Sequence, residues 1–244
     1  MKQTPSSVTL FIQCLVDTMF PEVAEAMVKV LKQLGLQVSC PTTQTCCGQP
    51  AFNSGHRSVA RTAAIKFINL FEEAETIVSP SGSCVNMVRH HYPELLADDP
   101  IMQERARRVG AKTYEYTQFL VDVLQVEDVG ARFPGTVTYH ASCHLNRFLG
   151  VDRQPRALLT HIRDMELIEM RDADRCCGFG GTFAVKYGDI SQAILKEKVE
   201  NILQTGVQIV TGCDMGCLMN IQGMLSRMNV SVQVQHIAQL LAER

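Results

Sequence analysis

The chain has 244 residues, a formal net charge of −2 and 46% hydrophobic residues, with no stripe of basic residues. This composition excludes a nucleic-acid-binding protein, and no apolar run approaches the roughly 18 residues that predict a membrane-spanning helix. Ten cysteines are too few for a small secreted disulfide scaffold, and the first residues lack a signal-peptide core. We therefore expect a reducing, cytoplasmic location, where a group of cysteines indicates metal binding or redox chemistry.

The first half of the chain alternates predicted strands and helices. Short runs rich in β-branched and aromatic residues predict strands, and apolar residues at helical spacing predict helices. In chain order these are a strand at 8–12, a helix at 21–34, a strand at 36–40, a helix at 59–71 and a strand at 76–78.

The second half repeats this order. It has a predicted strand at 136–139, a helix at 155–164, a strand at 165–170, a helix at 190–202 and a strand at 208–211. Both halves close on similar phrases, at 114–120 and 234–240. The pattern predicts an α/β fold of two similar parallel-sheet βα domains related by internal duplication, residues 1–130 and 131–244.

Four cysteines recur at nearly the same spacing in each half, and the middle two are adjacent and followed by glycine. They are Cys14, Cys46, Cys47 and Cys84 in the first half, and Cys143, Cys176, Cys177 and Cys217 in the second. Packing alone would accept alanine or valine at most of these places, so the repeat indicates that the thiols have a function. Each repeated cysteine falls in a loop after a predicted strand, and the carboxyl ends of parallel strands share one edge of a sheet. Four thiols are therefore expected to converge in each half.

Thiolates are soft ligands that suit iron–sulfur clusters, zinc and copper(I), and a set of four meets the usual requirement of a cluster. Two adjacent cysteines reach one site only if the chain turns there, and Gly48 and Gly178 permit such a turn. Iron–sulfur binding is the favoured interpretation. Zinc remains an alternative, although paired Cys-x-x-Cys knuckles are missing.

Several other residues near these motifs are candidates for smaller roles. Cys40 lacks a counterpart in the second half and is expected to be a buried structural cysteine, whereas Cys213 could join the second site. His140 and His144 flank Cys143 and could ligate a metal or carry protons, or simply form hydrogen bonds.

The duplicated Cys, Cys-Cys-Gly, Cys frame resembles the cysteine-rich domain of heterodisulfide reductase and of the glycolate oxidase iron–sulfur subunit. The phrases at 46–51, 80–84 and 176–183 are most similar to the lactate-utilisation protein A family. That resemblance implies a cytoplasmic protein that acts in oxidising L-lactate to pyruvate, with a ferredoxin-like iron–sulfur protein and a third lactate-utilisation subunit as partners. It also implies one cluster in each half, which we expect to be [4Fe–4S], bound by the eight repeated cysteines.

The chain departs from the reductase pattern at one position in each half. Where that domain carries an additional cysteine, this chain has Ser81 and Asp214, so a cluster bound by four cysteines is the simpler expectation. The chain also lacks a flavin or nicotinamide motif and a ferredoxin module, so we expect a subunit that is inactive alone. The alternatives are a zinc-bound or metal-free assembly protein that scaffolds redox partners, and a related subunit that acts on glycolate or a disulfide.

Overall fold

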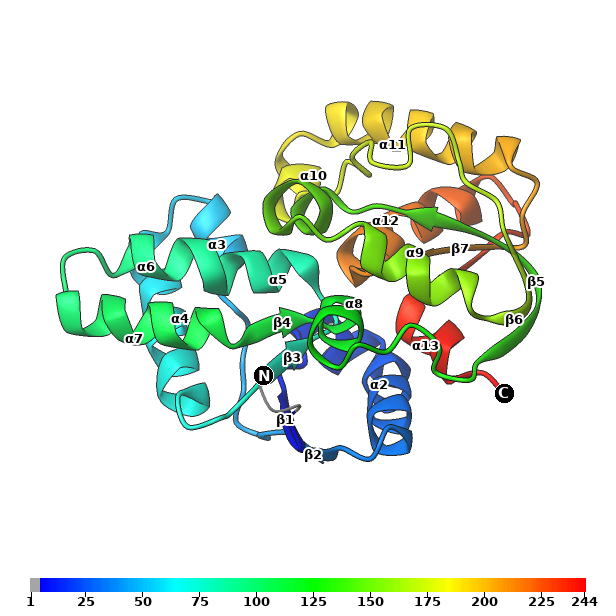
Figure 1. Cartoon of the computed structure of the whole chain (residues 1–244). Helices are drawn as coiled ribbons and strands as arrows, with labels where there is room; N and C mark the ends of the chain where they lie inside the picture. Colours follow the sequence, from blue (N-terminus) through cyan, green and yellow to red (C-terminus); the bar gives the residue numbers. More distant parts are fainter. Residues whose placement is uncertain (1–4) are drawn as a thin grey trace. The chain divides into compact units, whose positions relative to one another are not determined.

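The computed structural model describes residues 5–244 and divides into two compact units, the first ending at Gln125 and the second beginning at Val126. Each unit contains a four-stranded parallel sheet, in the order β2-β1-β3-β4 in the first and β6-β5-β7-β8 in the second. The two orders are the same once the strands are numbered within each unit. The predicted α/β fold and its duplication are therefore confirmed (Figure 1).

The elements of the first unit surround its sheet. The strands are β1 (Ser7–Leu10), β2 (Gln37–Ser39), β3 (Ile77–Ser79) and β4 (Thr113–Glu115). The helices are α1 (Cys14–Met19), α2 (Pro21–Gln33), α3 (Gln49–Asn53), α4 (Arg57–Phe71), α5 (Gly82–Asn86), α6 (Tyr92–Leu95), α7 (Pro100–Ala111) and α8 (Tyr116–Gln118), with π-helical segments η1 (Met87–His91) and η2 (Phe119–Val123).

The second unit follows the same plan. Its strands are β5 (Arg132–His140), β6 (Arg163–Leu167), β7 (Ile209–Gly212) and β8 (Gln233–His236). Its helices are α9 (Arg153–Thr160), α10 (Thr182–Lys186), α11 (Gly188–Gln204), α12 (Met215–Arg227) and α13 (Ile237–Ala242), with the π-helical segment η3 (His144–Phe148). No helix among residues 5–244 is both long and apolar enough to cross a membrane.

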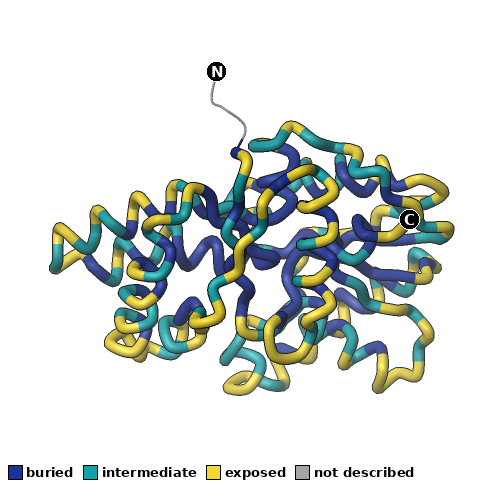
Figure 2. The backbone as a smooth tube through the Cα atoms, turned by 90° about the horizontal axis from the view of Figure 1, so that it is seen from below, coloured by how far each residue is buried: buried dark blue, intermediate teal, exposed yellow. Residues whose placement is uncertain are grey.

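Helix packing explains most of the sequence pattern. Along the long helices the backbone alternates between buried and exposed positions, as packing through one face requires (Figure 2). Helix α2 begins at Pro21, whose fixed φ suits a first turn, and it buries Val23, Met27 and Val30. Helix α4 buries its apolar face in a core that also contains Cys47 and Cys84. The core of the second unit likewise contains Cys177, with Cys217 packed against it, so the core of each unit lies directly against its cysteines.

Several details differ from the sequence prediction. Helix α9 ends at Thr160 and not at 164, because Arg163 already pairs with Arg132 in the sheet. Helix α11 was predicted from its isoleucines, but Ile190 is 56% exposed and the buried face begins at Ser191. The two closing phrases each overlap a fourth strand, β4 or β8, that runs directly into a helix.

Candidate metal-binding sites

The first unit gathers its thiols beyond the carboxyl ends of its strands. Cys14 opens α1 shortly after β1, Cys46 and Cys47 lie in the loop after β2, and Cys84 lies in α5 directly after β3. The loop prediction is wrong in one respect, because Cys14 and Cys84 stand in short helices. The side chain of Ser81 caps α5 by accepting a hydrogen bond from the Cys84 N–H at 3.2 Å, which starts a helix immediately after the strand.

The four thiols of this unit form a continuous chain of contacts. Cys14 interacts with Cys46, Cys46 with Cys47, and the Sγ atoms of Cys47 and Cys84 lie 3.4 Å apart. Gly48 makes the necessary turn with a φ of +84°, and its N–H points at Cys46 Sγ at 3.5 Å. The predicted convergence and the turn at Gly48 are therefore both present in the first unit.

The thiols of the first unit share their protons unequally. Hydrogen bonds donated by Cys14 and Cys47 lower the pKa of Cys46 to about 3. The same hydrogen bonds, together with burial, raise the pKa of Cys14 and of Cys47. One sulfur is thus a thiolate stabilised by thiol neighbours. Four thiolates at such short range would repel one another strongly, so full ionisation of this donor set calls for a cation among them.

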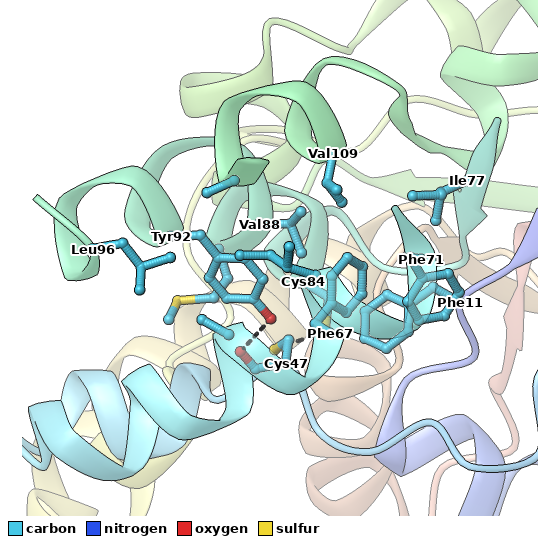
Figure 3. Close-up of a cluster of buried hydrophobic side chains, with 14 of the residues drawn as sticks. Phe11, Cys47, Phe67, Phe71, Ile77, Cys84, Val88, Tyr92, Leu96 and Val109 are labelled. Atoms are coloured by element: carbon cyan, nitrogen blue, oxygen red, sulfur yellow. Dashed lines mark hydrogen bonds between the residues drawn. The ribbon is translucent and has the colours of Figure 1, made fainter. Parts of the chain in front are cut away.

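The inner side of the first site is apolar. Figure 3 shows Phe11, Phe67 and Tyr92 packed beside Cys47 and Cys84. The rings of Phe11 and Phe67 meet edge to face, with centroids 4.7 Å apart. The Tyr92 hydroxyl donates a hydrogen bond of 2.9 Å to the Cys47 carbonyl. This wall keeps water away from two of the four sulfurs.

The second unit repeats the arrangement of thiols. Cys143 follows β5, Cys176 and Cys177 lie in the loop after β6, and Cys217 lies in the first turn of α12. The Gly178 N–H donates to Cys176 Sγ at 3.3 Å, and Gly178 has a φ of +81°.

The electrostatic pattern of the second unit matches that of the first. Hydrogen bonds from Cys143 and Cys177 lower the pKa of Cys176, and they raise the pKa of the two donors. Cys177 also contacts Cys217, which completes the chain of thiols. Each unit therefore presents a donor set whose softness and number fit iron–sulfur or zinc chemistry.

The two histidines beside Cys143 lie in different surroundings. His144 is partly buried, with its Nδ1 3.7 Å from Cys143 Sγ. His140 is fully buried, and one of its ring nitrogens lies within 4.8 Å of the sulfurs of Cys177 and Cys217, which are within the same distance of each other. Burial and the nearby charge of Lys198 lower the pKa of His140 to about 3, so its imidazole is neutral.

The remaining two cysteines do not belong to the repeated sequence pattern. Cys213 is buried, and its Sγ lies 3.7 Å from the Tyr139 hydroxyl. The Tyr139 ring also lies beneath the guanidinium of Arg156 in α9. Cys40 is exposed and accepts a hydrogen bond from Gln44, so the prediction that it is a buried cysteine is wrong. It lies just past the end of β2, an edge strand of its sheet.

Ser81 and Asp214 are helix caps. They stand at the positions where the reductase-type domain has an additional cysteine. Ser81 caps α5, and Asp214 caps α12 by accepting a hydrogen bond from the Gly216 N–H at 3.1 Å. Their side chains thereby start the helices that carry Cys84 and Cys217.

Sequence reasoning missed three side chains that support the sites. Tyr92 and Asn220 each donate 2.9 Å hydrogen bonds, to the carbonyls of Cys47 and Cys177 respectively. Lys198 is completely buried in α11 and donates to the carbonyls of Asp172 and Ala173, at 2.7 and 3.1 Å. A buried lysine in a helix of mixed polarity gives no signal in the sequence that separates it from a solvated one.

Comparison with known proteins agrees with this duplicated arrangement. A cysteine-rich domain, CCG, matches residues 8–89 and again residues 137–222. The chain is 49% identical to a protein named lactate utilization protein A from an Exiguobacterium species, over 97% of both chains. It is 48% identical to a lactate utilization protein A from Bacillus cereus, over 97% of this chain and 99% of the relative.

Among solved structures, a hypothetical protein from Helicobacter pylori has a similar fold. The TM-score is 0.65 with 9% sequence identity, covering 98% of this chain. The chain spans about half, 49%, of the length of that protein. At this identity the likeness shows the fold alone.

Proposed function

Because the chain belongs to the lactate utilization protein A family, we propose that it is an iron–sulfur redox subunit of a complex that oxidises L-lactate to pyruvate. The observation that carries the proposal is the duplicated set of four converging thiols. Each set contains one sulfur that is already a thiolate and accepts a backbone N–H. The names of the relatives supply lactate as the substrate of the complex.

Each half is proposed to be one cysteine-rich domain, residues 1–130 and 131–244, with one metal centre. The ligands are Cys14, Cys46, Cys47 and Cys84 in the first domain, and Cys143, Cys176, Cys177 and Cys217 in the second. A [4Fe–4S] cluster in each set would supply one-electron transfer.

The surrounding residues of the chain prepare both sites for such a group. The N–H groups of Gly48 and Gly178 donate to sulfur, and such hydrogen bonds favour the more negative, reduced form of a centre. The apolar wall of Phe11 and Phe67 lowers water access to the first site, which favours the less charged form. The reduction potential of each centre would be set by the balance of these opposing effects.

The proposed complex needs partners, because electrons must enter and leave the chain. We propose a ferredoxin-like iron–sulfur protein and a third lactate-utilisation subunit, all in the cytoplasm. The chain has no flavin or nicotinamide motif that would accept a hydride from lactate.

The test is anaerobic purification followed by iron and sulfide analysis, with EPR before and after dithionite. We expect a brown protein whose visible absorbance is bleached by the reductant. A colourless zinc protein would contradict the redox role and favour the scaffold alternative.

L-lactate oxidation is then assayed with an artificial acceptor, with and without the partners, and we expect turnover only with them. Robust turnover by the isolated chain would contradict the subunit role.

A further inference from the structure

The two units differ in the residues that lie behind their paired cysteines. The five buried positions of α4 recur at the same spacing in α11, and Phe67 in α4 corresponds to Lys198 in α11. At the carboxyl end of the first strand of each unit, Phe11 lies three residues before Cys14, and His140 lies three residues before Cys143. The aromatic pair in the first unit (Figure 3) is therefore replaced in the second by two basic side chains.

The sheet register supports this correspondence independently. Leu10 pairs with Val78 in the first unit, and Tyr139 pairs with Thr211 in the second. The residue after Leu10 is Phe11, and the residue after Tyr139 is His140. His140 thus takes the place of Phe11 in the fold as well as in the spacing of the sequence.

Both basic side chains are buried, with exposed fractions of 1% for His140 and 0% for Lys198. The Lys198 ammonium is satisfied by the carbonyls of Asp172 and Ala173. His140 is different, because the Ala173 carbonyl is the one hydrogen-bond acceptor that its ring approaches among residues 5–244, and neither ring nitrogen makes a well-formed hydrogen bond there. The nearby Ala173 carbonyl already accepts from the Ala141 N–H and from Lys198. A buried polar group without a well-formed hydrogen bond costs free energy, so the buried lone pair of the imidazole needs an explanation.

The thiols supply that explanation. One ring nitrogen of His140 and the sulfurs of Cys177 and Cys217 all lie within 4.8 Å of one another, a spacing at which a metal could contact all three. A neutral imidazole nitrogen is a good ligand for iron and zinc. The first unit cannot do the same, because Phe11 has no donor atom.

We propose that His140 is a nitrogen ligand of the metal centre in the second unit, beside Cys177 and Cys217. The two halves then hold chemically different centres, one with only thiolate ligands and one with thiolates and an imidazole. This inference rests on the proposed function, in that the second unit must hold a metal.

The test uses protein labelled with 15N-histidine and loaded anaerobically with iron and sulfide. Changing Cys46 and Cys47 to serine removes the first centre, so the EPR signal after dithionite reports the second centre alone. We expect strong 15N hyperfine coupling by ENDOR, which is lost in His140→Phe and kept in His144→Phe. The second variant is the matched control, because His144 is the other imidazole near the thiols. Strong coupling that survives in His140→Phe would overturn the proposal, as would only the weak coupling of a hydrogen-bonded imidazole.

A second measurement keeps the test independent of the cluster's spin state. The metal-free protein is loaded with 113Cd(II), and NMR is used to detect scalar coupling between cadmium and a histidine nitrogen, which requires a direct bond. Bound cadmium without such coupling at His140 would overturn the inference. Absence of any metal in the second unit would overturn the proposed function as well, so the two failures are distinguishable. If His140→Phe folds poorly, the double variant His140→Phe/Lys198→Phe recreates the aromatic pair of the first unit.

Discussion

Tyr92 and Cys47 are 45 positions apart in the chain and are joined by a buried hydrogen bond of 2.9 Å from the hydroxyl to the carbonyl (Figure 3). We expect Tyr92→Phe to lower the free energy of unfolding by about 1 to 3 kcal/mol, because the buried carbonyl loses its side-chain donor. The first centre should also release iron to a chelator faster. Urea unfolding and iron-release kinetics measure both effects. Tyr187→Phe removes the hydroxyl of a tyrosine that is 56% exposed and should change neither; equal effects of the two variants would contradict the role of Tyr92.

The separation of the thiols into two sets gives the second prediction. We expect Cys47→Ser to remove iron from the first half and to leave the second centre intact, since each chain of thiol contacts lies within one unit. Cys177→Ser should do the reverse. Cys40→Ser is the matched control, because Cys40 is exposed and outside both sets. Iron analysis with EPR checks all three. Loss of all iron from either ligand variant would instead indicate one centre shared by the halves.

The helix caps give the third prediction. We expect Asp214→Ala to lower the free energy of unfolding by about 0.5 to 2 kcal/mol, because the first turn of α12 loses its acceptor. Four thiols suffice in our proposal, so the iron-to-protein ratio should not change. Asp214→Asn keeps an acceptor oxygen and should keep most of the stability. Iron loss in Asp214→Ala would show that an oxygen ligand completes the site.

Much of this arrangement could be predicted from the sequence. The strands β1, β3 and β7 and the buried end of β5 are rich in β-branched and aromatic residues, so their composition reveals them, and each is followed by a cysteine at a recurring spacing. The fourth strands, β4 and β8, were not predicted because their polarity is mixed and each runs directly into a helix. Such short strands are defined by pairing with a neighbour, which periodicity alone cannot show.

The supporting side chains could not be predicted for a different reason. Tyr92 and Asn220 each donate a hydrogen bond to the carbonyl of the second cysteine of a pair. They occupy unrelated positions in the two repeats, so aligning the repeats does not reveal them. Lys198 occupies a buried position that only the packing of α11 reveals. Cys40 was misjudged because a lone cysteine is usually buried, whereas its edge strand leaves it exposed.

The turn after the second pair of cysteines gives the fourth prediction. A Cβ atom at Gly178 would lie 2.5 Å from the Ser191 carbonyl oxygen, and the residue has a φ of +81°. At Gly206 the φ is +69°, with open space around a Cβ atom. We expect Gly206→Ala to cost about 1 kcal/mol for the left-handed backbone, and Gly178→Ala to cost about 1 to 3 kcal/mol more from overlap. Urea unfolding measures the difference, and equal losses would contradict the close approach of α11 to this turn.

Lys198 gives the last prediction, on the pH dependence of stability. Burial lowers its pKa from the ordinary 10.5 to about 8. Between these pH values the folded protein binds fewer protons than the unfolded chain, so this lysine makes the free energy of unfolding rise with pH. The rise has an upper limit of about 3 kcal/mol.

The measurement is urea unfolding of the metal-free protein between pH 8 and pH 10, compared with Lys198→Met. The cysteines titrate in both proteins, so the difference between the two curves reports Lys198 together with its charge interactions with Cys177 and Cys217. We expect the free energy of unfolding of the native protein to rise relative to that of the variant as the pH rises. The reason is that Lys198 loses its proton and is then no longer buried as a cation. Two curves that stay parallel across this range would mean that Lys198 keeps an ordinary pKa, and that the carbonyls of Asp172 and Ala173 fully compensate its burial.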